Sequence, residues 1–262
     1  MVGIGRAAAA ATTIRECRRL LAASGTTLAR EAVGRTGEIG EWRHYPEGDA
    51  YDPVSHAQYF YHRHPAGEPP AGEHGHFHLF LRAEGMPRGM MPLLLPEAAI
   101  AFSHTPPQAA PTKRGAHDEV SHLVGIALDD SGEAWRLFTT NRWVTGETWY
   151  RAEDVVRMLE RFTLDRAEPA SIVGRWIAAI VRLYQPEIAM LLRKRDEAVM
   201  DPRRRRRKIE VFEDPRIEIT SSLAIDVDAR LAAVDRLVND AASATPTPVA
   251  SQLPPMAEGW GS

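Results

Sequence analysis

The segment EHGHFHLFLR, residues 73–82, restricts the fold of this chain more than any other feature, because histidine alternates with small or apolar residues in it. Alternate residues of a β-strand point to the same face of a sheet, whereas residues two apart on a helix diverge. A strand here therefore places His74, His76 and His78 on one face. Phe77 would then enter the opposite, apolar layer. We predict a strand with one histidine-lined face.

Neighbouring segments predict further strands. Residues 55–63, SHAQYFYHR, and residues 120–128, VSHLVGIAL, are rich in aromatic or β-branched side chains, as strands usually are. The turn sequence Asp-Asp-Ser-Gly at 129–132 leads into the run AWRLFTTNRWV, so these two runs predict a hairpin. Residues 35–54 are rich in Gly, Pro and Asp, and we expect a loop there. The strands should join as a mostly antiparallel sheet.

Helical periodicity lies before and after these strands. Apolar residues repeat at helical spacing within residues 13–34, although Gly25 interrupts the pattern. From Val155 onward apolar residues again recur every three or four positions, and Ser171 can cap a further helix. We therefore predict an α+β fold. In it a mostly antiparallel sheet carries a histidine-rich face and is flanked by N- and C-terminal helices.

The same patterns predict one folded domain over residues 13–240, with a flexible N-terminus at 1–12 and a disordered tail at 241–262. The predicted parts of the domain are the histidine-rich sheet at about 40–150, a helical part at about 150–200 and a small strand–helix piece at about 209–240. Ala, Ser, Thr and Pro dominate the tail, and such a composition buries too little apolar surface to fold.

All ten histidines of the chain lie between His44 and His122. Such clustering is typical of metal sites or of proton chemistry. The chain has one cysteine, Cys17, which excludes internal disulfides, cysteine-ligated zinc ribbons and cysteine-ligated iron–sulfur clusters. A nitrogen-rich site without sulfur suits one divalent transition metal, Fe, Cu, Zn or Mn, rather than Ca or Mg.

The spacing of the histidines indicates which of them could bind that metal. Residues two apart on a strand are separated by ~6.7 Å, so His76 and His78 can lean toward one ion. A third ligand is expected from a neighbouring strand, either His62 or His122, because catalytic sites usually leave one metal position open. His74 shares the strand as a further ligand or a substrate-facing group. The candidate ligands are His62, His74, His76, His78 and His122.

Three other polar residues are candidates for catalytic roles. Asp52, in the loop before the first predicted strand, could add a carboxylate to two histidines, which would favour Fe(II); the alternative is a turn former. Asn141 and Arg142 could orient a substrate carboxylate or phosphate, and the alternative is a solvated strand face. Glu73 directly precedes His74, so we expect it on the opposite face and a poor ligand.

Charge and hydropathy restrict the partners. The formal net charge of −3 and the sequence pI of ≈ 6.4 argue against a general nucleic-acid binder. The basic run Arg203–Lys208 could bind an anionic partner, although such a run is more typical of a solvated helix end or linker. No stretch approaches the ~18 consecutive apolar residues of a membrane span. We therefore expect a cytoplasmic protein without a membrane partner.

These features together predict a metal-dependent enzyme that acts on a small-molecule substrate, with O₂-dependent oxidation slightly favoured over hydrolysis. The proline-rich segment 104–116 would act as its lid. One alternative is a non-catalytic metal carrier, sensor or maturation factor with a saturated site of four histidines. Another is an interaction module whose histidines respond to pH and bind no metal. The sequence leaves the oligomeric state open.

Four segments, HYPEGDAYD, SHAQYFYH, EHGHFHLFLR and TTNRWVTGETW, give the chain a family resemblance over roughly residues 40–200. At these residues it resembles a family of uncharacterised bacterial proteins. The resemblance implies that the histidine strands belong to a defined domain, and it carries no activity. The HxH pair with one further histidine is also similar to the metal sites of carbonic anhydrases and cupins, which is a likeness of local geometry alone.

Overall fold

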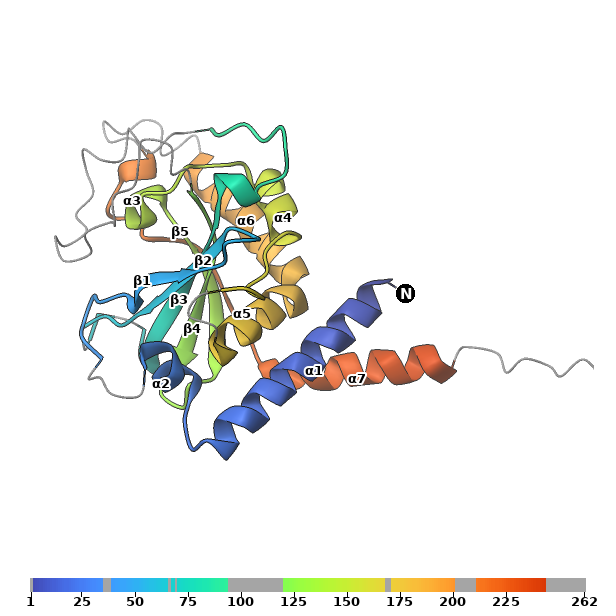
Figure 1. Ribbon diagram of the computed structural model, residues 1–262. Helices are drawn as coiled ribbons and strands as arrows, with labels where there is room; N and C mark the ends of the chain where they lie inside the picture. Colours follow the sequence, from blue (N-terminus) through green and yellow to red (C-terminus); the bar gives the residue numbers. More distant parts are fainter. Residues whose placement is uncertain are drawn as a thin grey trace, which may run out of the picture.

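The computed structural model of the 262-residue chain describes residues 2–34, 39–65, 67–68, 70–93, 120–167, 171–200 and 211–243. Its centre is a six-stranded sheet with helices packed beside it (Figure 1). The strands are β1 Tyr45–Tyr51, β2 Ala57–His62, β3 Glu73–Arg82, β4 Val120–Asp129, β5 Ala134–Thr140 and β6 Ile219–Ala224. Each strand pairs antiparallel with the next, in the order β1 to β6. The predicted α+β fold with a mostly antiparallel sheet is confirmed.

The hairpin between β4 and β5 forms where the turn sequence predicts it. The side chain of Asp129 accepts hydrogen bonds from the backbone N–H groups of Ser131 and Glu133, at 2.9 and 3.0 Å. Gly132 has a φ of 84°, in the left-handed region that glycine adopts without steric cost. The chain therefore reverses directly after β4 and brings β5 back alongside it.

Strand β1 corrects the expectation of a loop over residues 35–54. Tyr45–Tyr51 is a strand although it contains Pro46 and Gly48. It lies at the edge of the sheet that the described residues form, where one side of its backbone has no strand partner among them, so a proline that cannot donate a hydrogen bond is tolerated. Its pairing with β2 is irregular between Tyr45 and Ala50. The proline and glycine that suggested a loop instead mark an irregular edge strand.

Helices cover one face of the sheet (Figure 1). The helices are α1 Val2–Ala23, α2 Leu28–Val33, α3 Arg142–Thr145, α4 Ala152–Leu159, α5 Ile172–Leu183, α6 Gln185–Met200 and α7 Val227–Ser243, with short 3₁₀ turns η1 Ala83–Gly85 and η3 Val211–Glu213. In Figure 1, α4, α5 and α6 lie along the same side of the sheet, and α1 crosses α7. None of the described helices is long and apolar enough to cross a membrane.

Helix α1 begins at Val2, whereas the sequence predicted a flexible segment over residues 1–12. The five alanines at positions 7–11 are the best helix formers among the amino acids, and Ala10 and Ala11 are buried in the core. The helix ends at Ala23, just before Gly25, as the sequence predicted. At the other end of the chain, α7 reaches Ser243. Residues 244–262, the segment 104–116 and Arg203–Lys208 lie outside the described residues.

The apolar core lies between the helices and one face of the sheet. Phe77 packs against Tyr61 and Trp176, with ring centroids 4.9 and 6.4 Å away. Sheet residues that join this core include Tyr59, Tyr61, Phe77, Leu79, Leu81, Val124, Ile126 and Leu137. Burial of these side chains is the main stabilising term of the fold. The opposite face of the same strands carries histidines packed beside aromatic rings.

On that opposite face, Gly125 of β4 makes room for an aromatic ring. Gly125 is paired with both His78 and Phe138 across the sheet. A Cβ atom at Gly125 would overlap the Phe138 ring. The ring meets His76 and His78 nearly edge-on, at centroid distances of 5.1 and 5.8 Å. The glycine thus lets Phe138 pack close to the histidines.

We expect Gly125→Ala to destabilise the protein by about 1–3 kcal/mol, because the new methyl group must displace a buried ring. The change should appear as a lower urea midpoint with an unchanged slope. Gly5→Ala is the control, since Gly5 lies on an exposed position of α1 with open space around it. It should stabilise the helix by up to about 1 kcal/mol. Equal midpoints for the two variants would contradict this packing.

Candidate metal centre

A β-bulge at His74 decides which side chains of β3 face the histidine side. Glu73 pairs with Asp129, and Gly75 pairs with Leu128, so β3 advances two residues while β4 moves one. His74 is the extra residue. Its Nδ1 lies 2.6 Å from the hydroxyl of Tyr61, a core residue. The expectation that His74 shares a face with His76 and His78 therefore does not hold.

Gly75 makes this bulge sterically possible. A Cβ atom there would overlap the Tyr61 hydroxyl and the backbone oxygen of His62. A glycine inside a strand often marks a bulge or a close approach of another chain segment, and Gly75 combines both. Because position 75 has no Cβ atom, the Tyr61 hydroxyl can approach Nδ1 of His74.

The same bulge brings Glu73 onto the histidine face, opposite to expectation. The Nδ1–H of His76 donates to Oε1 of Glu73 at 2.7 Å, and Arg136 donates from Nη2 to Oε2 at 2.5 Å. The Glu73 side chain is 1% exposed. Burial alone would raise its pKa, but the bonds from His76 and Arg136 outweigh this and lower the pKa. The carboxylate is thus charged and buried, and each of its oxygens accepts a hydrogen bond.

Three buried imidazoles meet on this face. His62 of β2 is paired with His76 of β3, and His78 follows two residues later on β3. Their ligand atoms all lie within 4.8 Å of one another. The ring centroids are separated by 4.4 Å for His62–His76, 4.9 Å for His76–His78 and 5.2 Å for His62–His78. Among the described residues, this is the group of histidine, cysteine and acidic side chains that could hold a metal ion.

The closest contact within the triad joins His62 of β2 to His76 of β3. The Nε2 atoms of His62 and His76 are 2.6 Å apart, so one ring donates its proton to the other. Because Nδ1 of His76 donates to Glu73, the donor here is His62. Two nitrogens bound tetrahedrally to one ion are about 3.3 Å apart. The rings must therefore separate by roughly 0.7 Å when an ion replaces this proton.

His122 reaches the site from β4 through a second bulge. Leu79 pairs with Val124 and Phe80 pairs with His122, so Leu123 is the extra residue. Nε2 of His122 lies 3.1 Å from Nδ1 of His78, and its Nδ1 lies 3.3 Å from the Thr140 hydroxyl. His122 therefore contacts the His78 ring at its Nδ1 atom. Of the two expected third ligands, the structure brings His62 into the triad and not His122.

Burial keeps these imidazoles neutral. It holds the pKa values of His62 and His78 well below their usual range, and neighbouring histidines lower them further. Burial, with the charge of Arg195, lowers the pKa of His122 to about 3. Burial also lowers the pKa of His76, against the opposing effect of Glu73. Neutral imidazole is the form that binds a metal ion.

The candidate catalytic residues lie elsewhere and have structural partners. Asp52 accepts hydrogen bonds from the backbone N–H groups of Val54, Ser55 and Arg166, at 2.9, 2.9 and 2.7 Å. It thereby shapes the turn before β2, next to the pair Ala57–Leu81. The triad pair His62–His76 is at the other end of β2. This is the turn-forming role that the sequence left as the alternative.

Asn141 and Arg142 join the end of β5 to the C-terminal part of the chain. Asn141 caps α3, and its Nδ2 donates to the backbone oxygen of Val211 at 2.8 Å. Arg142 is 1% exposed; its Nε donates to the backbone oxygen of Glu147, and its Nη1 lies 3.2 Å from Oε1 of Glu213. Neither residue is on a solvated strand face, and these partners occupy them away from the triad.

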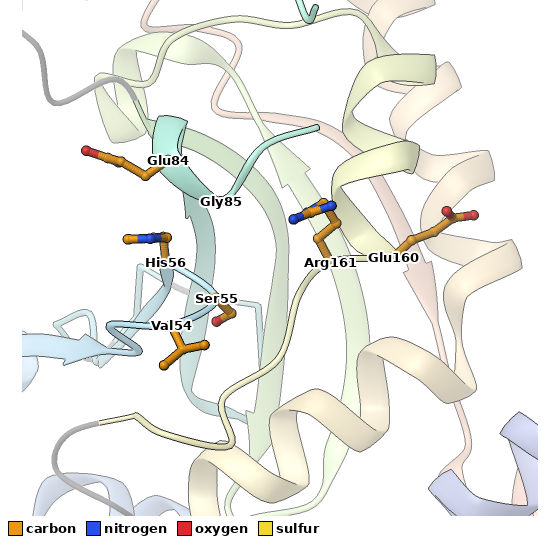
Figure 2. Close-up of a pocket in the computed structure, with 7 residues that line it drawn as sticks. All are labelled: Val54, Ser55, His56, Glu84, Gly85, Glu160 and Arg161. Atoms are coloured by element: carbon orange, nitrogen blue, oxygen red, sulfur yellow. The ribbon is translucent and has the colours of Figure 1, made fainter. Parts of the chain in front are cut away.

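A pocket of ≈ 320 Å³ lies apart from the triad (Figure 2). It is lined by Val54, Ser55, His56, Glu84, Gly85, Glu160 and Arg161. Figure 2 shows these residues on the turn before β2, on η1 and beyond α4. That places the pocket at the end of β2 and β3 where Ala57 meets Leu81. The histidine triad does not line it.

Sequence reasoning missed the role of Glu73 and the surroundings of the triad. Trp42 and His64 pack together with ring centroids 4.2 Å apart, and His44 stacks on Phe60 at 3.6 Å. These contacts depend on backbone turns in segments expected to be loops. For Glu73 one signal existed, because a glycine inside a strand, here Gly75, commonly indicates a bulge.

The chain belongs to a family described as a domain of unknown function, DUF6969, whose model matches residues 8–225. This confirms the resemblance to an uncharacterised family, and the match includes most of α1 and all of β6 as well as the histidine strands. No curated protein and no solved structure matches the chain.

We expect the metal-free protein to lose stability as the pH falls below about 6.5. In the unfolded chain His62, His78 and His122 bind protons near pH 6.5, whereas their folded-state pKa values are lower. The unfolded state therefore binds more protons as the pH falls, and each group costs up to about 1.4 kcal/mol per pH unit. Urea midpoints measured at pH 7.5 and 5.5 check this.

One group opposes this trend. Burial raises the pKa of Glu147 to about 7, so the folded state binds that proton first and gains stability between about pH 7 and 4.5. Because three imidazoles lower the stability and one carboxyl group raises it, the free energy of unfolding should fall overall between pH 7.5 and 5.5. A urea midpoint that is unchanged or higher at pH 5.5 would contradict the burial of neutral histidines.

Proposed function

We propose that this member of the DUF6969 family is a metal-dependent enzyme whose ion is bound by Nε2 of His62, His76 and His78. The observation that carries the proposal is the triad itself, three buried imidazoles from two paired strands with ligand atoms within 4.8 Å. Burying three imidazoles side by side costs free energy unless they are hydrogen-bonded or bind a ligand. A metal ion would satisfy all three at once.

The hydrogen bonds behind the triad support this assignment of ligand atoms. Nδ1 of His76 donates to Glu73, and Nδ1 of His78 faces His122. Both rings therefore turn Nε2 toward the centre of the triad. Metal-binding histidines almost always donate their other nitrogen to a carboxylate, carbonyl or similar partner, which fixes the ring and raises its basicity. Glu73 is in turn held by Arg136.

The donor set restricts the ion to transition metals. Three neutral nitrogens without sulfur suit one divalent Fe, Cu, Zn or Mn ion. Three protein ligands leave a coordination position open, which favours a catalytic ion over a structural one. In that position the ion would activate a small molecule or water.

The surroundings of the triad favour oxidation over hydrolysis. Phe60 and Phe138 contact His78, with ring centroids at 5.2 and 5.8 Å. Metal-dependent hydrolysis commonly uses a carboxylate as general base. Among the described acidic residues, Glu73 bonds to the triad, and its two oxygens are already occupied by His76 and Arg136. An aromatic site in which the carboxylate bonded to the triad already has two donors suits oxidation of a small-molecule substrate better.

The alternative is a non-catalytic carrier, sensor or maturation factor. It is favoured by the burial of the triad, whose three members are at most 9% exposed. It is also favoured by the position of the described pocket at the other end of β2. Such a protein would hold its ion in a saturated site of four histidines.

We expect about one equivalent of Fe, Cu, Zn or Mn per chain in protein purified without an affinity tag, measured by elemental mass spectrometry. The double variant His76→Ala/His78→Ala should contain none. His74→Ala is the matched control, because the bulge turns His74 toward Tyr61, and it should retain the metal. Wild-type protein that remains empty after reconstitution, with affinities weaker than about 1 mM, would refute the proposal.

We expect Glu73→Gln to weaken metal binding about 10–100-fold, because the amide has no charge to support His76 or to pair with Arg136. A competition titration with a chelator of known affinity measures this. Glu133→Gln is the control, since Glu133 pairs with Arg18 at the surface, away from the triad. Equal affinities for Glu73→Gln and Glu133→Gln would show that Glu73 does not support the ion.

A further inference from the structure

A fourth imidazole lies beside the triad at the spacing of a ligand. The ring of His64 is 5.0 Å from that of His62 and 5.1 Å from that of His76, between centroids. The corresponding distances inside the triad run from 4.4 to 5.2 Å. His64 is therefore as close to two of the three ligands as they are to one another.

An acidic side chain lies near Nδ1 of His64, as it does at His76. Nδ1 of His64 faces Oε2 of Glu68 at 3.7 Å, as Nδ1 of His76 faces Glu73 at 2.7 Å. A carboxylate on Nδ1 leaves Nε2 available to an ion. Nδ1 of His76 and Nδ1 of His78 are thus hydrogen-bonded, and Nδ1 of His64 has a carboxylate within ion-pair distance.

His64 differs from the triad in how firmly it is held. It lies two residues beyond the end of β2, its side chain is 13% exposed, and the Glu68 side chain is 54% exposed. Its packing partner Trp42 is 40% exposed and has a φ of 61°. The group of ligand atoms within 4.8 Å does not include His64, so its ring must turn inward to coordinate.

We propose that His64 is an exchangeable fourth ligand, which completes a site of four histidines at rest and leaves the ion when an anionic or small neutral ligand binds. This rests on the proposed metal site of His62, His76 and His78. It reconciles the three-ligand enzyme with the four-histidine carrier, because one residue decides between the two coordination states. Ligands that reach the ion would replace one imidazole and would meet Trp42 at the same edge.

His44 offers a matched control. Like His64 it is a partly exposed imidazole with an acidic partner, Asp49, at 3.2 Å. Its ring stacks on Phe60 and lies 5.9 Å from His62, farther than any spacing inside the triad. It therefore shares the chemistry of His64 without its position.

The test uses the full chain loaded with Co(II), whose visible absorption is intense in tetrahedral sites and weak at higher coordination numbers. We expect His64→Ala to change the spectrum, to lower Co(II) affinity about tenfold or more, and to strengthen azide binding by a similar factor. His44→Ala should match the wild type in all three. Azide should convert the wild-type spectrum toward that of the azide-bound His64→Ala protein.

Several results would overturn the inference. Identical spectra and azide affinities for His64→Ala and His44→Ala would do so, and so would a wild-type spectrum that azide does not alter. An X-ray absorption count of three imidazoles in the resting wild-type protein would also overturn it, and that measurement needs no variant. Failure of the wild type to bind Co(II) at all would instead refute the metal site itself, so the two failures are distinguishable.

Discussion

The hydrogen bond between Glu73 and His76 is the interaction on which the site depends, and a backbone bulge creates it. Without the extra residue at His74, the two-residue period of β3 would direct Glu73 into the apolar core. With it, the carboxylate lies on the histidine face, where His76 and Arg136 pair with it. A buried carboxylate is tolerable only with such partners. The bulge, the ion pair and the orientation of His76 therefore form one unit.

The sequence predicts most of the sheet but not the details that position its side chains. Alternation in EHGHFHLFLR defined β3 to the residue, and the turn at 129–132 defined the β4–β5 hairpin. His76 and His78 follow directly from that alternation. Alternation assumes an uninterrupted strand, however, so it misplaced Glu73 and His74. A bulge depends on the partner strand, which a local pattern does not contain.

Other differences have the same origin in non-local partners. Residues 45–51 looked like a loop, because Pro46 and Gly48 disfavour strands, yet the free edge of the sheet accommodates them. His62 and His122 were equivalent candidates until pairing placed His62 opposite His76 and placed His122 behind His78. Short-range sequence patterns predict which residues form strands and which face of the sheet each side chain is on. The register between strands determines which of those side chains are in contact.

The two faces of the sheet differ in role: one forms the apolar core, and the other carries the candidate metal site. The face that packs against the helices buries aromatic and aliphatic side chains, and their burial stabilises the fold. This stabilisation offsets the cost of burying imidazoles on the other face. That second face keeps its histidines neutral through burial and holds two of them from behind, by Glu73 and His122. Burying the imidazoles in this arrangement lowers the stability of the fold when no ion is bound. An ion that binds only the folded state would raise the free energy of unfolding. At the edge of the site, by contrast, His64 and Trp42 are partly exposed. Coordination can therefore change at that edge without disturbing the paired strands that hold the triad.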